Sequence, residues 1–243
     1  MPCRYRAIFF DLDGTLISER AGVPEARAAV AAMLRDAGHT ISDVTYADAA
    51  QAVINAAIAA NGGSWPVTFS RLDAITQTIS ALGIAASDTD LAALAERYKE
   101  TRLQCVERLP AAIDVLEAAA AERPLGLITN GPSEEQRLKL RRSELERYFT
   151  SVTISGDLDT AKPDPEIFER AVASLAVSAK QCVYVGNNFA ADVVGATGAG
   201  LDAVWLTQTG ESTPAAAAGG TVQPLAVIRA LDELSAVLGL GHH

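Results

Sequence analysis

The chain is organised around one short stretch, Ile8–Leu16, which reads IFFDLDGTL. Its apolar beginning is typical of a buried strand, and two acids, Asp11 and Asp13, follow directly. In an open parallel sheet, ligands bind beyond the carboxyl ends of the strands, so the two acids are predicted to stand at a functional site. Asp-Gly is also common turn chemistry, so this prediction needs support from later segments.

The composition is that of a soluble globular protein. The 243 residues are 49% hydrophobic and 21% charged, which suits a sizeable core and argues against disorder. We expect neither export nor membrane insertion, because no apolar run is long enough and the N-terminus lacks a signal-peptide layout. A formal net charge of -10 disfavours a nucleic-acid partner. The cysteines, Cys3, Cys105 and Cys182, suggest neither disulfides nor zinc, and a cytoplasmic location is expected.

The pattern of elements changes twice along the chain. Between residues 17 and 109, apolar stripes broken by glycines predict four helices and no strand. From residue 110 onward, strands alternate with helices, which predicts βαβ units and a parallel sheet. The strand before Asp11 has no partner in the helical part and is expected to join the later strands. We therefore predict an α/β core of residues 1–16 and 110–243, with residues 17–109 inserted as a helical domain.

Four strand ends or loops carry polar groups that suit phosphoryl transfer. Asp11 and Asp13 are followed by Thr129–Gly131, by Lys162, and by the sequence GNNFAAD at residues 186–192. One carboxylate can attack phosphorus, a second can transfer protons, and hydroxyl and amide groups can hold phosphoryl oxygens. A lysine offsets negative charge, and oxygen ligands can hold Mg²⁺. The sequence therefore predicts a phosphoryl-transfer site.

These four motifs, in this order and at these intervals, resemble those of the haloacid dehalogenase (HAD) superfamily. The helical insertion between the first two motifs is similar to the family's C1 cap, so the resemblance covers nearly the whole chain. It implies a Rossmann-like parallel-sheet core with an inserted α-helical cap domain. It also implies a phosphatase-type hydrolase that uses Mg²⁺ and forms an aspartyl-phosphate.

The resemblance further implies a role for each motif residue. Asp11 is expected to be the nucleophile and a Mg²⁺ ligand. Asp13 is expected to protonate the leaving group and then activate water, while its main-chain carbonyl ligates the metal. Lys162 would neutralise charge between nucleophile and phosphate, with Thr129 completing the catalytic set. The expected phosphate-binding residues are Leu12, Asp13, Thr129, Asn130, Gly131 and Lys162. The expected metal ligands are Asp11, Asp13, Asn187 and Asp192.

The fourth motif departs from the common pattern of the family. Many members have an aspartate directly after the glycine, whereas this chain has Asn187 there and keeps the later acid, Asp192. An asparagine oxygen can ligate Mg²⁺ but contributes no negative charge, so weaker binding is expected. Asp192 has three alternative roles: it ligates Mg²⁺ directly, it ligates Mg²⁺ through water, or it orients Lys162.

Hydrolysis of a small phosphorylated metabolite is the function that these residues favour. Dehalogenases that resemble this family lack an acid at the position of Asp13, and a halide leaves without a proton, so Asp13 favours phosphate over a 2-haloacid. A phosphomutase, which would shield the aspartyl-phosphate from water, is a further alternative function. Asn187 also suggests a third alternative, a catalytically idle binding protein with this fold.

Substrate specificity is expected in the cap, because the core motifs recognise only phosphate and metal. The irregular segment 62–71 is the candidate region, with Trp65 and Arg71 as substrate contacts. The alternative is that Trp65 packs inside the cap and Arg71 is a solvated residue at a helix start. The connections near residues 16–20 and 108–110 are expected to act as joints for cap opening.

Overall fold

The computed structural model describes residues 4–60, 69–207 and 222–240; the candidate contact Trp65 lies outside these ranges. The chain forms two compact units, one of Met1–Ser18 with Glu107–His243 and one of Glu19–Val106. We call them the core unit and the helical unit. In the described ranges, no helix is long and apolar enough to span a membrane.

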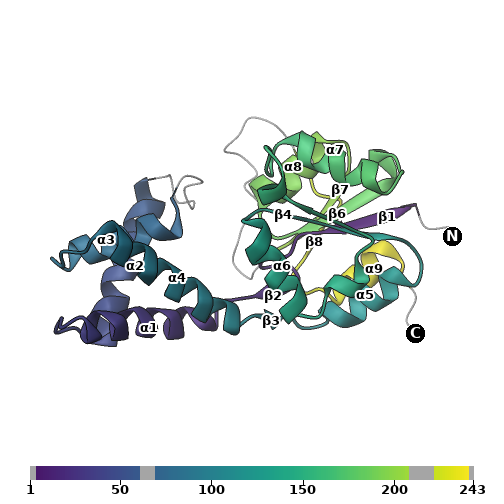
Figure 1. Ribbon diagram of the computed structural model, residues 1–243. Coiled ribbons are helices and arrows are strands. Elements are labelled where there is room, and N and C mark those ends of the chain that lie inside the picture. The colour runs from purple at the N-terminus through teal and green to yellow at the C-terminus, as the bar shows by residue number, and fades with distance from the viewer. Residues whose placement is uncertain (1–3, 61–68, 208–221, 241–243) are drawn as a thin grey trace. The chain divides into compact units, whose positions relative to one another are not determined.

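The core unit is built on a parallel sheet, which contains six strands in the described part of the chain (Figure 1). Their order across the sheet is β5-β4-β1-β6-β7-β8. β1 lies between β4 and β6, and the residues of all three strands are buried, as the apolar runs predict. The strands are β1 (Ala7–Phe10), β4 (Leu125–Thr129), β5 (Ser151–Ile154), β6 (Cys182–Gly186), β7 (Asp202–Leu206) and β8 (Ala226–Ile228).

Helices cover both faces of this sheet. Figure 1 shows α7 and α8 on one face, and α5 and α9 on the other. Phe9, Phe168 and Tyr184 are among the residues that form the core beneath α7. The helices are α5 (Ala112–Ala120), α6 (Ser133–Arg142), α7 (Pro165–Ser174), α8 (Gly195–Gly198) and α9 (Glu233–Leu238), with a π-helical turn at Phe189–Val194. The predicted α/β fold with a parallel sheet is confirmed.

The helical unit contains α1 (Gly22–Asp36), α2 (Asp43–Ala60), α3 (Arg71–Ala81) and α4 (Asp88–Gln104). Its core gathers apolar residues from all four helices around the buried Tyr46. The spacing of Ser70 and Asp73 predicts a capping box at the start of α3, and it is confirmed, because the two residues exchange side-chain-to-backbone hydrogen bonds of 3.1 and 2.8 Å. The sequence pattern predicts a second helix from near Asp48 to Ala60, but α2 begins at Asp43. The Ser42 hydroxyl accepts the Thr45 N–H at 3.0 Å and caps the helix earlier.

The two units divide at positions slightly different from those predicted. β2 (Ile17–Ser18) and β3 (Glu107–Arg108) pair in antiparallel register, and the Leu109 N–H donates to the Leu16 carbonyl oxygen at 2.9 Å. This pairing ties both connecting segments to the core unit. The divisions therefore fall after Ser18 and before Glu107, instead of after residue 16 and before residue 110.

The spacing of Leu225, Ile228, Leu231 and Leu234 predicts a closing helix, and this prediction is wrong. Ala226–Ile228 forms β8, which pairs in parallel with β7, and α9 begins only at Glu233. Ile228, Leu231 and Leu234 are all buried. Their three-residue spacing arises from a strand, a turn and a short helix in succession, and a helix with one apolar face would show the same spacing.

Candidate active site

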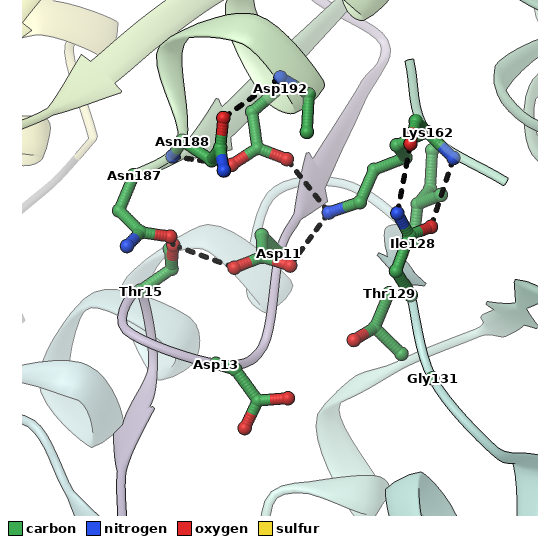
Figure 2. Close-up of polar contacts among 12 residues, drawn as sticks. Asp11, Asp13, Thr15, Ile128, Thr129, Gly131, Lys162, Asn187, Asn188 and Asp192 are labelled. Atoms are coloured by element: carbon green, nitrogen blue, oxygen red, sulfur yellow. Dashed lines mark hydrogen bonds and ion pairs between the residues drawn. The ribbon is translucent and has the colours of Figure 1, made fainter. Parts of the chain in front are cut away.

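The carboxyl ends of three neighbouring strands bring the motifs together (Figure 2). Asp11 directly follows β1, Thr129 is the last residue of β4, and Gly186 is the last residue of β6. The Asp11 N–H donates to the Val185 carbonyl oxygen at 2.9 Å, which extends the β1–β6 pairing to the nucleophile candidate. Lys162 reaches the same point from the loop before α7. The four motifs thus meet at one edge of the sheet, as predicted for a parallel sheet.

Lys162 lies between two carboxylates at the centre of the site. Its Nζ is 2.7 Å from Asp11 Oδ1 and 2.7 Å from Asp192 Oδ1, and it donates to the Tyr184 hydroxyl at 2.8 Å. The Tyr184 hydroxyl in turn donates to the Ile128 carbonyl oxygen at 3.0 Å. All three ammonium protons therefore have acceptors, and the position of Lys162 is fixed. Figure 2 shows Lys162 reaching both carboxylates.

Burial dominates the electrostatics of this cluster. Burial raises the pKa of Asp11 to about 7; the Lys162 charge opposes this rise, and the Asp192 charge adds to it. For Lys162, burial alone would lower the pKa, but the charges of Asp11 and Asp192 outweigh it and the pKa is raised. When all three groups are ionised, the cluster carries one excess negative charge. A cation beside Asp11 would offset that charge and favour the carboxylate form.

The second oxygen of Asp11 faces Thr15 and Asn187. Thr15 Oγ1 donates to Asp11 Oδ2 at 3.0 Å. One end of the Asn187 amide lies 3.3 Å from Asp11 Oδ2 and 3.1 Å from the Asp13 main-chain oxygen. With Nδ2 at that end, the amide donates to both oxygens. With Oδ1 there, three oxygens converge, a donor set that suits a hard cation such as Mg²⁺. The predicted ligands Asp11, Asp13 and Asn187 thus fit a metal.

Gly14 allows Asn187 to come this close. Its φ of +82° is one that residues with a side chain rarely adopt, and a Cβ there would lie 2.5 Å from the Asn187 side-chain amide. The Trp205 indole N–H donates to the main-chain carbonyl oxygen of Asn187 at 2.9 Å and holds the loop that follows β6. Gly14 is therefore required both by the turn after the two acids and by the close approach of Asn187.

Asp192 is buried, and both of its oxygens have partners. Oδ1 accepts from Lys162, and Oδ2 accepts the Asn188 N–H at 2.8 Å. A Cβ at Gly186 would lie 2.5 Å from the Asp192 carboxyl group, so the glycine makes room for this arrangement. Among the three roles considered for Asp192, the geometry favours orientation of Lys162. Ligation of a metal by Asp192, directly or through water, stays a prediction.

Helix α6 supplies two contacts to Asp13 that the sequence did not reveal. Gln136 Nε2 donates to Asp13 Oδ2 at 2.8 Å, and Lys139 Nζ lies 3.1 and 3.0 Å from the two Asp13 oxygens. The spacing of Ser133 and Gln136 predicts a capping box at the start of α6, and this prediction is wrong. The cap position is Pro132, which makes no side-chain capping bond, and Gln136 turns into the site instead. The signal in the sequence for the two contacts was the three-residue spacing of Gln136 and Lys139 on a helix directly after the second motif.

In the second motif, the Asn130 side chain forms a structural link. It exchanges hydrogen bonds of 2.9 Å with both the N–H and the carbonyl oxygen of Lys162. Thr129 is fully buried and accepts from Gln136 at 2.7 Å, while the Gly131 N–H donates to Ser155 Oγ at 3.0 Å. The phosphate contacts expected of Thr129, Asn130 and Gly131 stay predictions.

Leu12 is buried directly between the two acids. Its carbonyl oxygen accepts the Leu16 N–H at 3.0 Å, within the turn that follows β1. The phosphate contact expected of Leu12 also stays a prediction.

Arg71 is the first residue of α3 and is half-buried. It lines a cavity of about 240 Å³ within the helical unit. Arg27, Arg102, Tyr46 and Tyr98 also line this cavity, which therefore combines guanidinium and aromatic groups. These groups suit an anion with an apolar body.

Comparison with known proteins identifies the family to which this sheet, the acids at its strand ends and the buried lysine belong. The sequence model of the haloacid dehalogenase-like hydrolases matches residues 5–200. The chain therefore belongs to this family, and the predicted family and hydrolase class are confirmed.

Several characterised proteins resemble the chain over most of its length. It is 28% identical over 205 residues to the glyceraldehyde 3-phosphate phosphatase of Pyrococcus furiosus, covering 84% of this chain and 81% of that protein. It is 30% identical over 212 residues to the human N-acylneuraminate-9-phosphatase, covering 85% and 84%. Among solved structures, the HAD-hydrolase YfnB from Bacillus subtilis bound to magnesium has a TM-score of 0.73 and 25% identity, covering 98% of this chain and 100% of that one.

Proposed function

We propose that this protein is a phosphatase that hydrolyses a small phosphomonoester through an aspartyl-phosphate on Asp11. The observation that carries the proposal is the unequal surroundings of the two acids. Asp11 is buried beside Lys162, whereas the side chain of Asp13 is 39% exposed and is held from α6. Two carboxylates in different environments suit two roles, one nucleophilic and one in proton transfer. The named phosphatases among its relatives support this assignment.

The reaction would proceed in two steps. Asp11 attacks phosphorus while the bond to the leaving oxygen breaks, and Asp13 gives its proton to that oxygen. Asp13 then takes a proton from water, which attacks phosphorus, releases inorganic phosphate and regenerates the Asp11 carboxylate. Lys162 keeps its charge next to Asp11 throughout, because Asp192 and Tyr184 hold it there. Thr129 would hold a phosphoryl oxygen.

Mg²⁺ is the proposed cofactor, with Asp11, the Asp13 main-chain oxygen and Asn187 as its protein ligands. The described residues contain no cluster of three His, Cys, Asp or Glu side chains that could hold a metal. A set of one carboxylate, one carbonyl and one amide oxygen is consistent with that finding. When bound, the ion would offset negative charge between nucleophile and phosphoryl group.

Replacing Asn187 with aspartate should tighten Mg²⁺ binding. The new carboxylate adds a negative charge at a position 3.3 Å from Asp11 Oδ2, and charged ligands raise affinity for hard cations. We expect the dissociation constant to fall about tenfold, equivalent to about 1.4 kcal/mol. Isothermal titration calorimetry with MgCl₂ measures it. Asn188→Asp is the matched control, because the Asn188 side chain accepts the Ala191 N–H at 2.9 Å and caps a helix. Equal or weaker binding by Asn187→Asp would refute the ligand role.

A simple assay separates this function from its alternatives. The purified protein with Mg²⁺ should release phosphate from p-nitrophenyl phosphate or acetyl phosphate, and should release no chloride from 2-chloropropionate. Chloride release without metal would instead support a dehalogenase. The observation in favour of that alternative is the similarity to a solved 2-haloacid dehalogenase from Pseudomonas syringae, at 25% identity and a TM-score of 0.65. No turnover of any phosphorylated compound would favour an idle binding protein.

The helical unit is proposed to set substrate specificity, with Arg71 and Trp65 as contacts. The cavity beside Arg71, with further arginines and tyrosines, supports a leaving group that carries negative charge on an apolar body. Arg71→Ala should raise KM about tenfold for the best metabolite found in a screen of phosphorylated compounds, and leave KM for p-nitrophenyl phosphate unchanged. The control is Arg97→Ala, which removes an exposed arginine from the same unit. An unchanged KM for that metabolite would remove Arg71 from the proposal.

A further inference from the structure

Lys139 is a buried cation whose partner is the proton-transfer residue. Only 5% of Lys139 is exposed, and its Nζ lies within 3.1 Å of both Asp13 oxygens. Glu135, one turn earlier on α6, lies 3.5 Å from the same Nζ. Burying an ammonium group is costly unless it is paired, so this lysine is held in place by its contacts with the Asp13 and Glu135 carboxylates. The contact with Asp13 is bidentate, which limits rotation of that carboxylate.

Gln136 adds a second restraint and links Asp13 to the second motif. It is 1% exposed, and its Nε2 lies 2.8 Å from Asp13 Oδ2, 2.7 Å from Thr129 Oγ1 and 2.8 Å from the Asn130 carbonyl oxygen. One amide group therefore touches both the proton-transfer residue and the residue expected to hold a phosphoryl oxygen. Because α6 begins four residues after Thr129, the helix carries both restraints rigidly into the site.

The position in which Asp13 is held suits a proton donor to the leaving group. In Figure 2, the Asp13 carboxylate points away from the cluster of Asp11, Lys162 and Asp192. In phosphoryl transfer, the attacking and leaving oxygens lie roughly in line on opposite sides of phosphorus. A residue that serves the leaving oxygen must therefore stand apart from the nucleophile. With 39% of its side chain exposed, Asp13 would sample several rotamers without these two contacts.

We propose that Lys139 and Gln136 are positioning residues that fix the Asp13 carboxylate for proton transfer to the leaving oxygen. Neither residue needs to touch the substrate. The inference rests on the proposed phosphatase function, and it adds that α6 determines how well the enzyme expels poor leaving groups.

The test compares two leaving groups in the Lys139→Met variant. The ratio kcat/KM reports steps up to departure of the leaving group, and p-nitrophenolate departs without a proton, whereas an alkoxide needs one. For an alkyl phosphate that the wild-type enzyme hydrolyses, we expect kcat/KM to fall at least about tenfold. For p-nitrophenyl phosphate, we expect a change of less than about threefold. Lys139→Arg, which can also pair with both oxygens, should restore most of the alkyl activity.

Arg141→Met removes an exposed cation from the same helix and should leave both ratios unchanged. An equal fall for both substrates would mean a purely structural role, and no fall for either would mean no role; each result overturns the proposal. If Lys139→Met does not fold, as judged by thermal unfolding, Lys139→Gln is tested by the same comparison. Failure of the proposed function shows differently, as a wild-type protein without Asp11-dependent phosphate release, and would overturn this inference as well.

Discussion

Asp11→Asn should reduce phosphate release from p-nitrophenyl phosphate by at least about a thousandfold, because a carboxamide cannot form the aspartyl-phosphate. The substitution keeps the size of the side chain, and its Oδ1 can still accept from Lys162, which lies 2.7 Å from Asp11 Oδ1. The site should therefore keep its shape while losing its nucleophile.

The same variant should be no less stable than the wild type at pH 8. Burial raises the folded-state pKa of Asp11 to about 7 from 3.8, so the ionised carboxylate costs folding free energy above that pH. An uncharged amide avoids this cost, and Lys162 keeps Asp192 as its partner. Thermal unfolding with a chelator present measures the stability. Residual turnover within about tenfold of the wild type in a folded Asp11→Asn protein would contradict the nucleophile assignment.

Lys162→Met should cost both stability and activity. Lys162 is the partner shared by Asp11 and Asp192, and all three side chains are buried. Removing one partner from a buried ion pair leaves uncompensated charge and typically costs about 3–5 kcal/mol. We expect a loss of this size in the free energy of unfolding at pH 8, measured by urea denaturation with a chelator present. Lys180→Met, which removes an exposed lysine, is the control and should have little effect.

The loss in Lys162→Met should also depend on pH. The Lys162 charge lowers the pKa of Asp11, so its removal raises that pKa beyond about 7. A folded-state pKa above the unfolded value means that the folded protein binds the proton more tightly, so stability rises as pH falls through the folded-state pKa. The difference between variant and wild type should therefore be largest above pH 7 and smaller at pH 5. A difference that grows towards low pH would contradict the ion-pair account.

The sheet and the four motifs were predictable because their signals are local. Each strand is a short apolar run, and a polar residue directly after such a run lies at the edge where sites form. Asp11, Thr129 and the loop from Gly186 follow this rule, and the structure brings them together. Lys162 does not follow a strand directly, so the prediction of its position in the site depended on the family resemblance.

The residues that sequence reasoning missed make contacts that depend on tertiary packing, which decides where each side chain points. Tyr184 lies in an apolar strand, and nothing in the local pattern shows that its hydroxyl contacts Lys162. Gln136 fits a helix-capping pattern equally well, and only the packing of α6 turns it towards Asp13. The unit boundary was misplaced for a similar reason, because the pairing of Ile17–Ser18 with Glu107–Arg108 joins segments that are far apart in the sequence.

The central claim is that Asp11 carries the phosphoryl group during turnover. The most direct measurement is mass spectrometry of acid-quenched Asp13→Asn protein after incubation with p-nitrophenyl phosphate and Mg²⁺. This substrate needs no acid to form the intermediate, while loss of the base slows its hydrolysis, so the intermediate should accumulate. The account predicts one phosphoryl group on the peptide that contains Asp11, and none in an Asp11→Asn, Asp13→Asn double variant. Phosphoryl transfer to another residue, or phosphate release by the wild type with Asp11 never modified, would contradict it.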